Sequence, residues 1–234
     1  MGTLFMVATP IGNLEDITMR ALQTLREVDV IACEDTRHTQ RLLTRYDIHK
    51  RLIACHAHNE TSSAAGIVKL LSEDNNIAFV SDAGTPGISD PGARVVNAVR
   101  EAGFPIVPIP GASALATLIS VSGFVGKAFL FEGFMSPRAG RRRKRLVELL
   151  ARDEAFIVYE SPFRVVKLLE ELASLAPDRR ILVGREMTKA FEEFVDGTAQ
   201  TVAGDFAKRT SIKGEFAICI SPSETARTED EETE

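Results

Sequence analysis

The strongest constraint on the fold is a regular alternation, in the first half of the chain, of short apolar runs with longer amphipathic segments. The runs are rich in β-branched residues, which is typical of buried strands. The segments between them carry apolar residues at helical spacing, as at Ile67, Leu70 and Leu71. This order predicts an α/β fold in which crossover helices join the strands of a largely parallel sheet.

The same reading extends to the second half. In the first half we expect strands at Leu4–Ala8, Val28–Cys33, Leu52–Cys55, Ile77–Ser81 and Pro105–Ile109, and helices at Thr18–Arg26, Thr36–Tyr46, Thr61–Leu71 and Ala93–Ala102. In the second half we expect strands at Ala128–Glu132, Phe156–Tyr159, Ile181–Arg185, Phe191–Asp196 and Phe216–Ser221, and helices at Arg141–Leu150 and Phe163–Leu175. Two glycines between Val121 and Lys127 predict an interdomain linker. The expected organisation is an α/β domain over 1–121, a second over 128–221, and a disordered acidic tail over 222–234.

Charge is distributed unevenly along the chain. Lys and Arg total 28 against 33 acidic residues, and the tail holds six acids against the single Arg227, so the rest is formally neutral. A neutral body argues against a protein that coats nucleic acid through charge alone, and a polyanion would have to meet a local patch. Residues 138–145 provide one, with six basic residues in eight. Such a run is either a solvated helix face or a phosphate-binding surface.

Cysteine and histidine usage indicates no metal site. The chain has three cysteines and no CxxC spacing, which argues against a disulfide framework or a structural zinc and fits a reducing compartment. His56 and His58 have no acidic or thiol cluster beside them, so we expect no metal. The N-terminal segment lacks the features of a secretion signal, and no apolar run approaches about 18 residues. We therefore expect a cytoplasmic protein without a membrane span.

The most informative segment is the loop Ser81–Gly92, with the sequence SDAGTPGISDPG, which follows an expected strand. Loops of similar character follow the first and fifth strands, at 9–13 and 108–113, and carboxyl ends of strands are where open α/β sheets bind ligands. The absence of GxxxxGK[ST] and GxGxxG disfavours ATP and NAD. These loops lack Lys and Arg and carry Asp82, so they suit a cationic sulfonium such as S-adenosylmethionine, unless they are stiff turns that serve only the fold.

Nine motifs, taken in chain order, carry a resemblance to a known family. They are TPIGNL, CEDTR, HNE, SDAGTPGISDPG, PGASA, EGF, YESPFR, REMTK and KGEF. Together they resemble the ribosomal RNA small subunit methyltransferase I family, a branch of the tetrapyrrole-methylase superfamily, from about Leu4 to Ser221. The resemblance implies the two-domain tetrapyrrole-methylase fold (class III methyltransferase) with the cofactor in the interdomain cleft. It also implies S-adenosylmethionine-dependent 2′-O-methylation of a cytidine ribose in 16S ribosomal RNA, free or within the small ribosomal subunit.

The resemblance also assigns site residues. Cofactor contacts carried over by motif are Pro10, Ser81, Ala83, Gly84, Thr85, Ile88, Ser113, Ala114, Glu160 and Met187. We expect the proton of the ribose hydroxyl to pass to Glu186, or to a lysine with a depressed pKa, Lys189 or Lys213. Phosphates would be held by Arg37, Arg141, Arg142, Arg143, Lys144, Arg145 and Arg164. Glu34, Asp35 and Arg37 are equally open to a role as helix caps.

Three further interpretations concern partners and rival functions. Phe191, Phe194 and Val195 cluster in one short strand, which, with the resemblance, predicts a homodimer unless these residues fill the core. The shared fold also permits a small-molecule methyltransferase acting on a tetrapyrrole. A non-catalytic RNA-binding or ribosome-assembly protein is the other alternative, and cofactor binding separates it from an enzyme.

Overall fold

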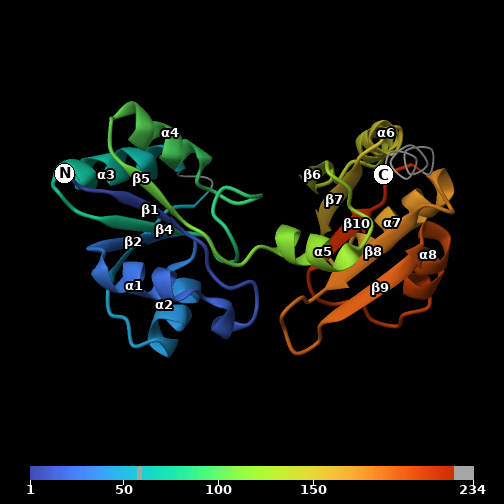
Figure 1. Ribbon diagram of the computed structural model, residues 1–234, viewed down its shortest axis with the longest axis horizontal. Helices are drawn as coiled ribbons and strands as arrows, with labels where there is room; N and C mark the ends of the chain where they lie inside the picture. The colour runs from blue at the N-terminus through green and yellow to red at the C-terminus, as the bar shows by residue number, and fades with distance from the viewer. Residues whose placement is uncertain (57–59, 224–234) are drawn as a thin grey trace. The chain divides into compact units, whose positions relative to one another are not determined.

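The computed structural model describes residues 1–56 and 60–223 and divides the chain into two compact units (Figure 1). The first unit is Met1–Ser113 and the second begins at Ala114. Helix α5, Ala114–Ser122, belongs to the second unit because it packs on a strand there, so this division differs by one helix from the predicted limit at residue 121. His58 and nearly all of the acidic tail lie outside the described residues.

The first unit is a parallel sheet between two helical layers. Its strands are β1 (Leu4–Val7), β2 (Val30–Cys33), β3 (Arg51–Ala54), β4 (Ile77–Val80) and β5 (Ile106–Ile109), in the order β3-β2-β4-β1-β5. Its helices are the 3-10 turn η1 (Leu14–Asp16), α1 (Met19–Glu27), α2 (Thr36–Arg45), α3 (Glu60–Ser72) and α4 (Ala93–Glu101). Every strand pair is parallel, as the sequence predicts.

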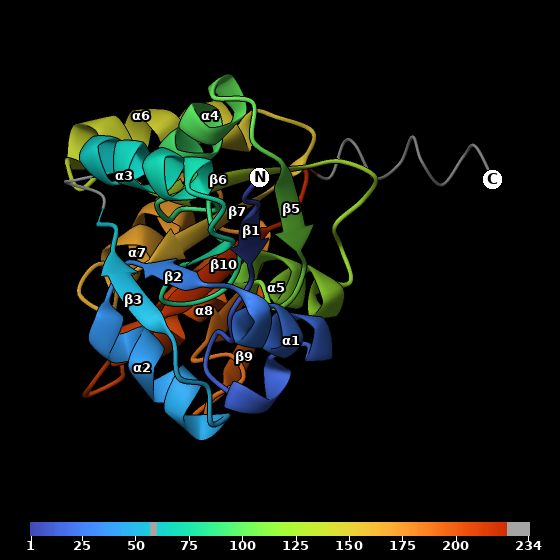
Figure 2. The same ribbon diagram turned by 90° about the vertical axis from the view of Figure 1, so that its left-hand side faces the viewer.

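Alternation along the strands explains the layers of the first unit. Val7 and Ile31 face α1 and α2, where they pack with Leu25. Leu4 and Phe79 point to the opposite face and pack against α3 and α4. Figures 1 and 2 show these helix pairs on opposite sides of the sheet. Because both faces are covered, β2 and β4 are buried at every residue, which accounts for their unbroken apolar sequence.

The second unit is built on a mixed sheet. Its strands are β6 (Phe129–Phe134), β7 (Ala155–Glu160), β8 (Arg180–Arg185), β9 (Glu193–Thr198) and β10 (Phe216–Ile220), in the order β6-β7-β10-β8-β9. Its remaining helices are α6 (Ala139–Leu150), α7 (Val165–Leu175) and α8 (Ala199–Ala207). Strands β6 and β7 are parallel, whereas β10 runs antiparallel to both of its neighbours. The amino end of β10 therefore lies beside the carboxyl ends of β7 and β8.

The two faces of this sheet carry different helices. Phe156, Val183 and Ile218 point to the face where α6, α7 and α8 pack and form one core with them. Gly184 points to the other face, and a Cβ there would lie 3.0 Å from Cδ1 of Leu118 in α5. Helix α5 therefore covers the face opposite α6, α7 and α8.

All ten expected strands are present, with ends shifted by a few residues. The expected helices include neither η1 nor α5, and they also lack α8. Helix α8 begins at the cap Thr198, whose hydroxyl accepts the Thr201 N–H, and Gly204 interrupts its apolar pattern. Within the described residues, no helix combines the length and the apolar character needed to cross a membrane.

Candidate functional site

The loops after β1, β4 and β5 are tied together by hydrogen bonds. Thr9 and Gly84 form an antiparallel bridge in which the Thr9 N–H donates to the Gly84 carbonyl at 2.9 Å and the Gly84 N–H donates back at 3.0 Å. The Thr9 hydroxyl also donates to the Ser81 carbonyl at 3.2 Å. The third loop is joined by the Thr85 hydroxyl, which donates to the Ala112 carbonyl at 3.2 Å. The three loops that the sequence singles out thus form one cluster.

Glycine is required at position 84. Its φ of +77° lies in the left-handed region, which side chains disfavour. A Cβ at this position would stand 3.3 Å from Cγ2 of Ile11 and 3.7 Å from the Ala112 carbonyl oxygen. The loop after β4 can therefore approach the other two loops closely only because residue 84 has no side chain.

The predicted cofactor residues of the first unit divide by exposure. Pro10, Ser81 and Gly84 are buried and shape the cluster from within. Ala83 is exposed. The half-exposed members are Thr85, Ile88 and Ser113. Ala114 opens α5 and groups with the second unit.

Carboxylates dominate the neighbouring strand ends, after β2 and β4. Asp82 Oδ1 accepts the Asp35 N–H at 3.0 Å, and Asp35 caps α2 by accepting the Arg37 N–H at 2.7 Å. That hydrogen bond lowers the pKa of Asp35, whereas burial, followed by the charge of Asp82, raises the pKa of Glu34. Arg37 is exposed on the first turn of α2. Asp35 is therefore a helix cap, and this edge favours a cationic ligand.

Three charged residues form a cluster after the carboxyl end of β8 in the second unit. They are Glu186, Lys189 and Glu215, and we call them the Glu186 cluster. Lys189 Nζ lies 2.9 Å from Glu186 Oε1 and 2.9 Å from Glu215 Oε2, and the Glu215 N–H donates to Glu186 Oε1 at 2.9 Å. Glu186 has a φ of +48°, and a Cβ on Gly214 would lie 2.4 Å from its Cγ. Gly214, with a φ of +99°, thus makes room for the Glu186 side chain.

The electrostatics of the Glu186 cluster correct the expectation about the Lys189 pKa. Burial lowers the pKa of Lys189, but its hydrogen bonds to Glu186 and Glu215 outweigh burial and raise that pKa. Burial likewise raises the pKa of Glu186, but the hydrogen bonds from Lys189 and from the Glu215 backbone lower it. The prediction of a depressed pKa for Lys189 is therefore wrong. Lys213 is exposed, and its carbonyl accepts the Arg185 Nε–H at 2.8 Å.

Glu160 and Met187, the predicted cofactor residues of the second unit, are both buried. Glu160 Oε1 accepts the Ser161 N–H at 2.8 Å and lies 2.7 Å from Arg164 Nη2. Its Oε2 is buried and has no hydrogen-bond partner among the residues that the structure describes. A buried carboxylate oxygen in this state is costly unless a donor reaches it, so it fits a position that a ligand completes.

The basic run does not lie wholly on the surface. Arg142 is buried, with 6% of its side chain exposed, and it binds Glu171 of α7 through two hydrogen bonds of 2.6 and 2.9 Å. Arg145 binds Glu132 in the same two-pronged way. A guanidinium already neutralised by a carboxylate is a poor phosphate ligand. The expectation that the run binds phosphate as a unit is therefore wrong at Arg142 and weakened at Arg145. The separate expectation of a phosphate contact at Arg164 is weakened as well, because Arg164 pairs with Glu160.

Three residues of the run remain on the surface. Arg141, Arg143 and Lys144 are exposed, and Arg143 Nη1 donates to the Ser174 hydroxyl at 3.1 Å. We call these three residues the basic face of α6. In the described part of the chain, none of the three has a carboxylate partner.

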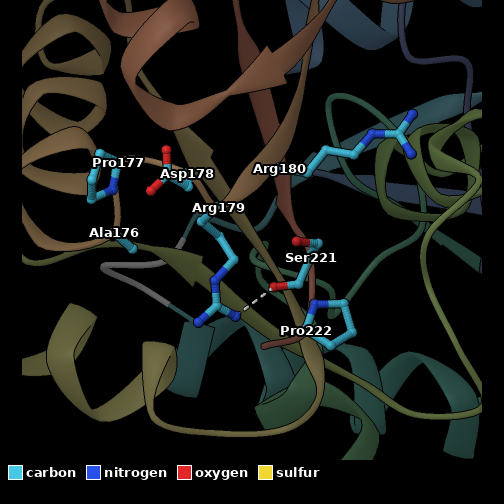
Figure 3. Close-up of a pocket in the computed structure, with 7 residues that line it drawn as sticks. All are labelled: Ala176, Pro177, Asp178, Arg179, Arg180, Ser221 and Pro222. Atoms are coloured by element: carbon cyan, nitrogen blue, oxygen red, sulfur yellow. Dashed lines mark hydrogen bonds between the residues drawn. The ribbon is translucent and has the colours of Figure 1, made fainter. Parts of the chain in front are cut away.

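A pocket of about 240 Å³ lies at the other end of β8 (Figure 3). It is lined by residues 176–180, Ser221 and Pro222, and Arg179 Nη1 donates to the Ser221 carbonyl at 3.0 Å. The six-residue strand β8 separates this pocket from the Glu186 cluster by roughly 17 Å, at about 3.3 Å per residue. It contains none of the predicted site residues.

The sequence analysis did not identify two residues at the Glu186 cluster. Gly214 and Glu215 lie in the KGEF motif, whose lysine alone was singled out. Their role depends on β10 lying antiparallel to β8, a pairing that sequence periodicity does not reveal. Among the described residues, no group of three or more His, Cys, Asp or Glu side chains could hold a metal ion.

Comparison with known proteins agrees with these features. The sequence matches the family of Tetrapyrrole (Corrin/Porphyrin) Methylases over residues 3–203. It is 46% identical to a ribosomal RNA small subunit methyltransferase I of Borrelia garinii, over 94% of this chain and 99% of the relative. It is 44% identical to the Bacillus subtilis protein of the same name, over 99% of this chain and 79% of the relative.

Solved structures show the same fold at low identity. The methyltransferase CobJ matches with a TM-score of 0.72 and 18% identity, over 95% of each chain. A uroporphyrin-III C-methyl transferase from Thermus thermophilus, in complex with S-adenyl homocysteine, matches with a TM-score of 0.65 and 18% identity, over 97% of this chain and 100% of that one.

The fit between Gly214 and Glu186 generates a stability prediction. Gly214→Ala combines a left-handed φ with a clash against Glu186, and we expect it to cost about 1 to 3 kcal/mol. Gly204→Ala is the matched control, since a Cβ there meets nothing within 4 Å and Ala favours the helix by about 0.5 to 1 kcal/mol. Thermal unfolding of both variants measures the effect. An unchanged midpoint for Gly214→Ala would refute the proposed fit.

Proposed function

The chain belongs to the tetrapyrrole methylase family, among its ribosomal RNA small subunit methyltransferase I members, and on that premise we propose that it methylates the ribose 2′-oxygen of a cytidine in 16S ribosomal RNA. The observation that carries the proposal is 46% identity to a relative of that name over nearly the whole length of both chains. A ribosomal substrate, free or assembled, assigns the reaction to the cytoplasm.

S-adenosylmethionine is the methyl donor of this family, and when bound it supplies an electrophilic methyl group on a sulfonium. The loop cluster of the first unit fits such a ligand. It has no Lys or Arg, and it carries the carboxylate of Asp82, with Glu34 at the neighbouring strand end. We propose cofactor contacts at Pro10, Ser81, Ala83, Gly84, Thr85, Ile88 and Ser113, with Ala114, Glu160 and Met187 from the second unit.

Glu186 is the proton acceptor that the second unit supports best. Its lowered pKa keeps the carboxylate deprotonated at neutral pH, whereas the raised pKa of Lys189 keeps that amine protonated and unable to accept a proton. The ion pair is lost only when pH falls below the Glu186 pKa or rises above the Lys189 pKa. A flat rate profile through neutral pH follows from these directions.

A transfer assay tests the proposed function. The purified protein, labelled S-adenosylmethionine and small ribosomal subunits or naked 16S RNA should yield label in a 2′-O-methylated cytidine after digestion to nucleosides. Label on a base instead of a ribose would contradict the 2′-O assignment. Transfer to a uroporphyrin-type tetrapyrrole instead of RNA would favour the small-molecule alternative, and no transfer with intact cofactor binding would favour a non-catalytic protein.

Glu186→Gln tests the proton acceptor. Because a carboxylate with a lowered pKa is a weak base, we expect a loss in kcat near the low end of the usual range, about 100-fold. Cofactor affinity should be retained. Glu215→Gln removes the other, largely exposed partner of Lys189 and should lower kcat much less. Equal losses in the two variants would show that the carboxylates act only by holding Lys189.

The basic face of α6 is the proposed RNA-binding surface, with Arg37 as a further phosphate contact. Replacing Arg141, Arg143 and Lys144 by Ala should lower the salt dependence of RNA binding by about 2 in logarithmic slope, as expected for three contacts to a single strand. Arg142→Ala is the opposite control. It should leave RNA affinity unchanged but lower the free energy of unfolding by about 1.5 to 3 kcal/mol, because Glu171 loses its ion-pair partner. An unchanged salt slope in the triple variant would refute this role.

We further propose a homodimer through the edge strand β9. Phe194 in β9 and Phe191, two residues before the strand, are exposed, while Val195 packs against the core, so the two phenylalanines are not core residues. An open edge with exposed aromatic residues favours pairing with a second copy. Light scattering at micromolar concentration should give a mass near twice 25.6 kDa, and Phe194→Glu should halve it. A wild-type mass of one chain contradicts the dimer.

A further inference from the structure

Two phenylalanine rings stand in solvent at the carboxyl ends of neighbouring strands in the second unit. Phe134 ends β6 and is 57% exposed. Phe163 follows β7 by three residues and is 90% exposed. Phe131, on the same strand as Phe134, is by contrast half-buried against Tyr159. We call Phe134 and Phe163 the aromatic patch.

A ring contact holds Phe134, and hydrogen bonds fix the backbone around Phe163. Phe134 pairs with Tyr159 across the parallel strands, and the two rings meet edge to face with centroids 5.8 Å apart. Phe163 lies in a turn closed by the Arg164 N–H, which donates to the Ser161 carbonyl at 3.1 Å. Arg164 Nη1 also donates to the Met135 carbonyl at 3.4 Å, which joins the segment after Phe134 to the segment after Phe163. The Phe134 ring and the backbone that carries Phe163 are therefore preorganised.

The chemistry around the patch indicates its ligand. Helix α6 starts five residues after Phe134 and carries Arg141 and Lys144, and Arg138 before it is also exposed. Exposed aromatic rings next to cations are how proteins bind single-stranded nucleic acid, because bases stack on the rings while the cations meet phosphates. A purely apolar partner would not require these exposed cations on the segment that follows Phe134.

We propose that Phe163, assisted by Phe134, stacks on an unpaired base of the RNA substrate. The proposal rests on the proposed function, since it assigns a base-binding site to the same substrate. Arg141 and Lys144 hold the phosphates of that segment, and the rings hold its bases. Neither phenylalanine takes part in methyl transfer.

The absence of tryptophan from the chain permits a direct test. Phe163→Trp introduces the sole tryptophan at the patch. A single-stranded cytidine oligoribonucleotide should quench its fluorescence, and an abasic oligomer of equal length and charge should not. Phe129→Trp is the matched control. Phe129 is 45% exposed and begins β6, so it lies roughly 17 Å from Phe134 at the other end of that strand. Equal quenching by the abasic oligomer, or at Phe129→Trp, overturns the proposal.

Alanine variants separate this proposal from the proposed function. If the wild type methylates RNA, Phe163→Ala should weaken RNA binding roughly 10-fold to 100-fold, the usual effect of losing a stacked base. Phe163→Trp should restore the affinity, and the affinity for S-adenosylmethionine should stay the same in both variants. A wild type that transfers no methyl group to RNA refutes the proposed function, whatever the variants do.

Two outcomes overturn the stacking proposal alone. One is an active wild type whose RNA affinity is unchanged in Phe163→Ala. The other is a fall of the light-scattering mass in Phe163→Ala without loss of RNA affinity, which would assign the patch to contact with a second copy of the chain. Phe163 is so exposed that its replacement leaves the core intact.

Discussion

The main-chain bridge between Thr9 and Gly84 is the interaction on which the candidate cofactor site depends. Two hydrogen bonds fasten the loop after β1 to the loop after β4, and the Thr9 hydroxyl reinforces them by binding the Ser81 carbonyl. The bridge needs a left-handed residue without a side chain at position 84, beside Ile11. The strand order makes this bridge possible, because β1 lies between β4 and β5 and the carboxyl ends of the three strands are therefore adjacent.

A left-handed glycine is equally important in the second unit. Gly214, again left-handed, leaves space for Glu186, and the carboxylate is held by Lys189 and by the Glu215 N–H. The three loops of the first unit lack Lys and Arg, which suits a sulfonium, whereas the second unit has a deprotonated carboxylate next to an ammonium. The proposed cofactor binding and the proposed proton acceptance call for these different environments, and each place contains a left-handed glycine.

Sequence reasoning located the elements well because apolar periodicity reports burial directly. It identified every strand and most helices, and it placed the candidate cofactor loops at strand ends where the structure brings them together. It failed where the outcome depends on a partner distant in the chain. Arg142 is buried because Glu171 of α7 lies opposite it, and the Lys189 pKa is raised because β10 delivers Glu215. Composition alone does not distinguish such paired charges from free ones.

Calorimetric titration with S-adenosylmethionine tests the central claim, that the bridged loops of the first unit form the cofactor site. Ala83 is exposed beside the bridge, so Ala83→Trp adds bulk at the ligand position without disturbing the fold. Ala151→Trp, at an exposed residue after α6, serves as the control. The account predicts that binding heat disappears in Ala83→Trp and persists in Ala151→Trp. Wild-type affinity in a folded Ala83→Trp protein would contradict it.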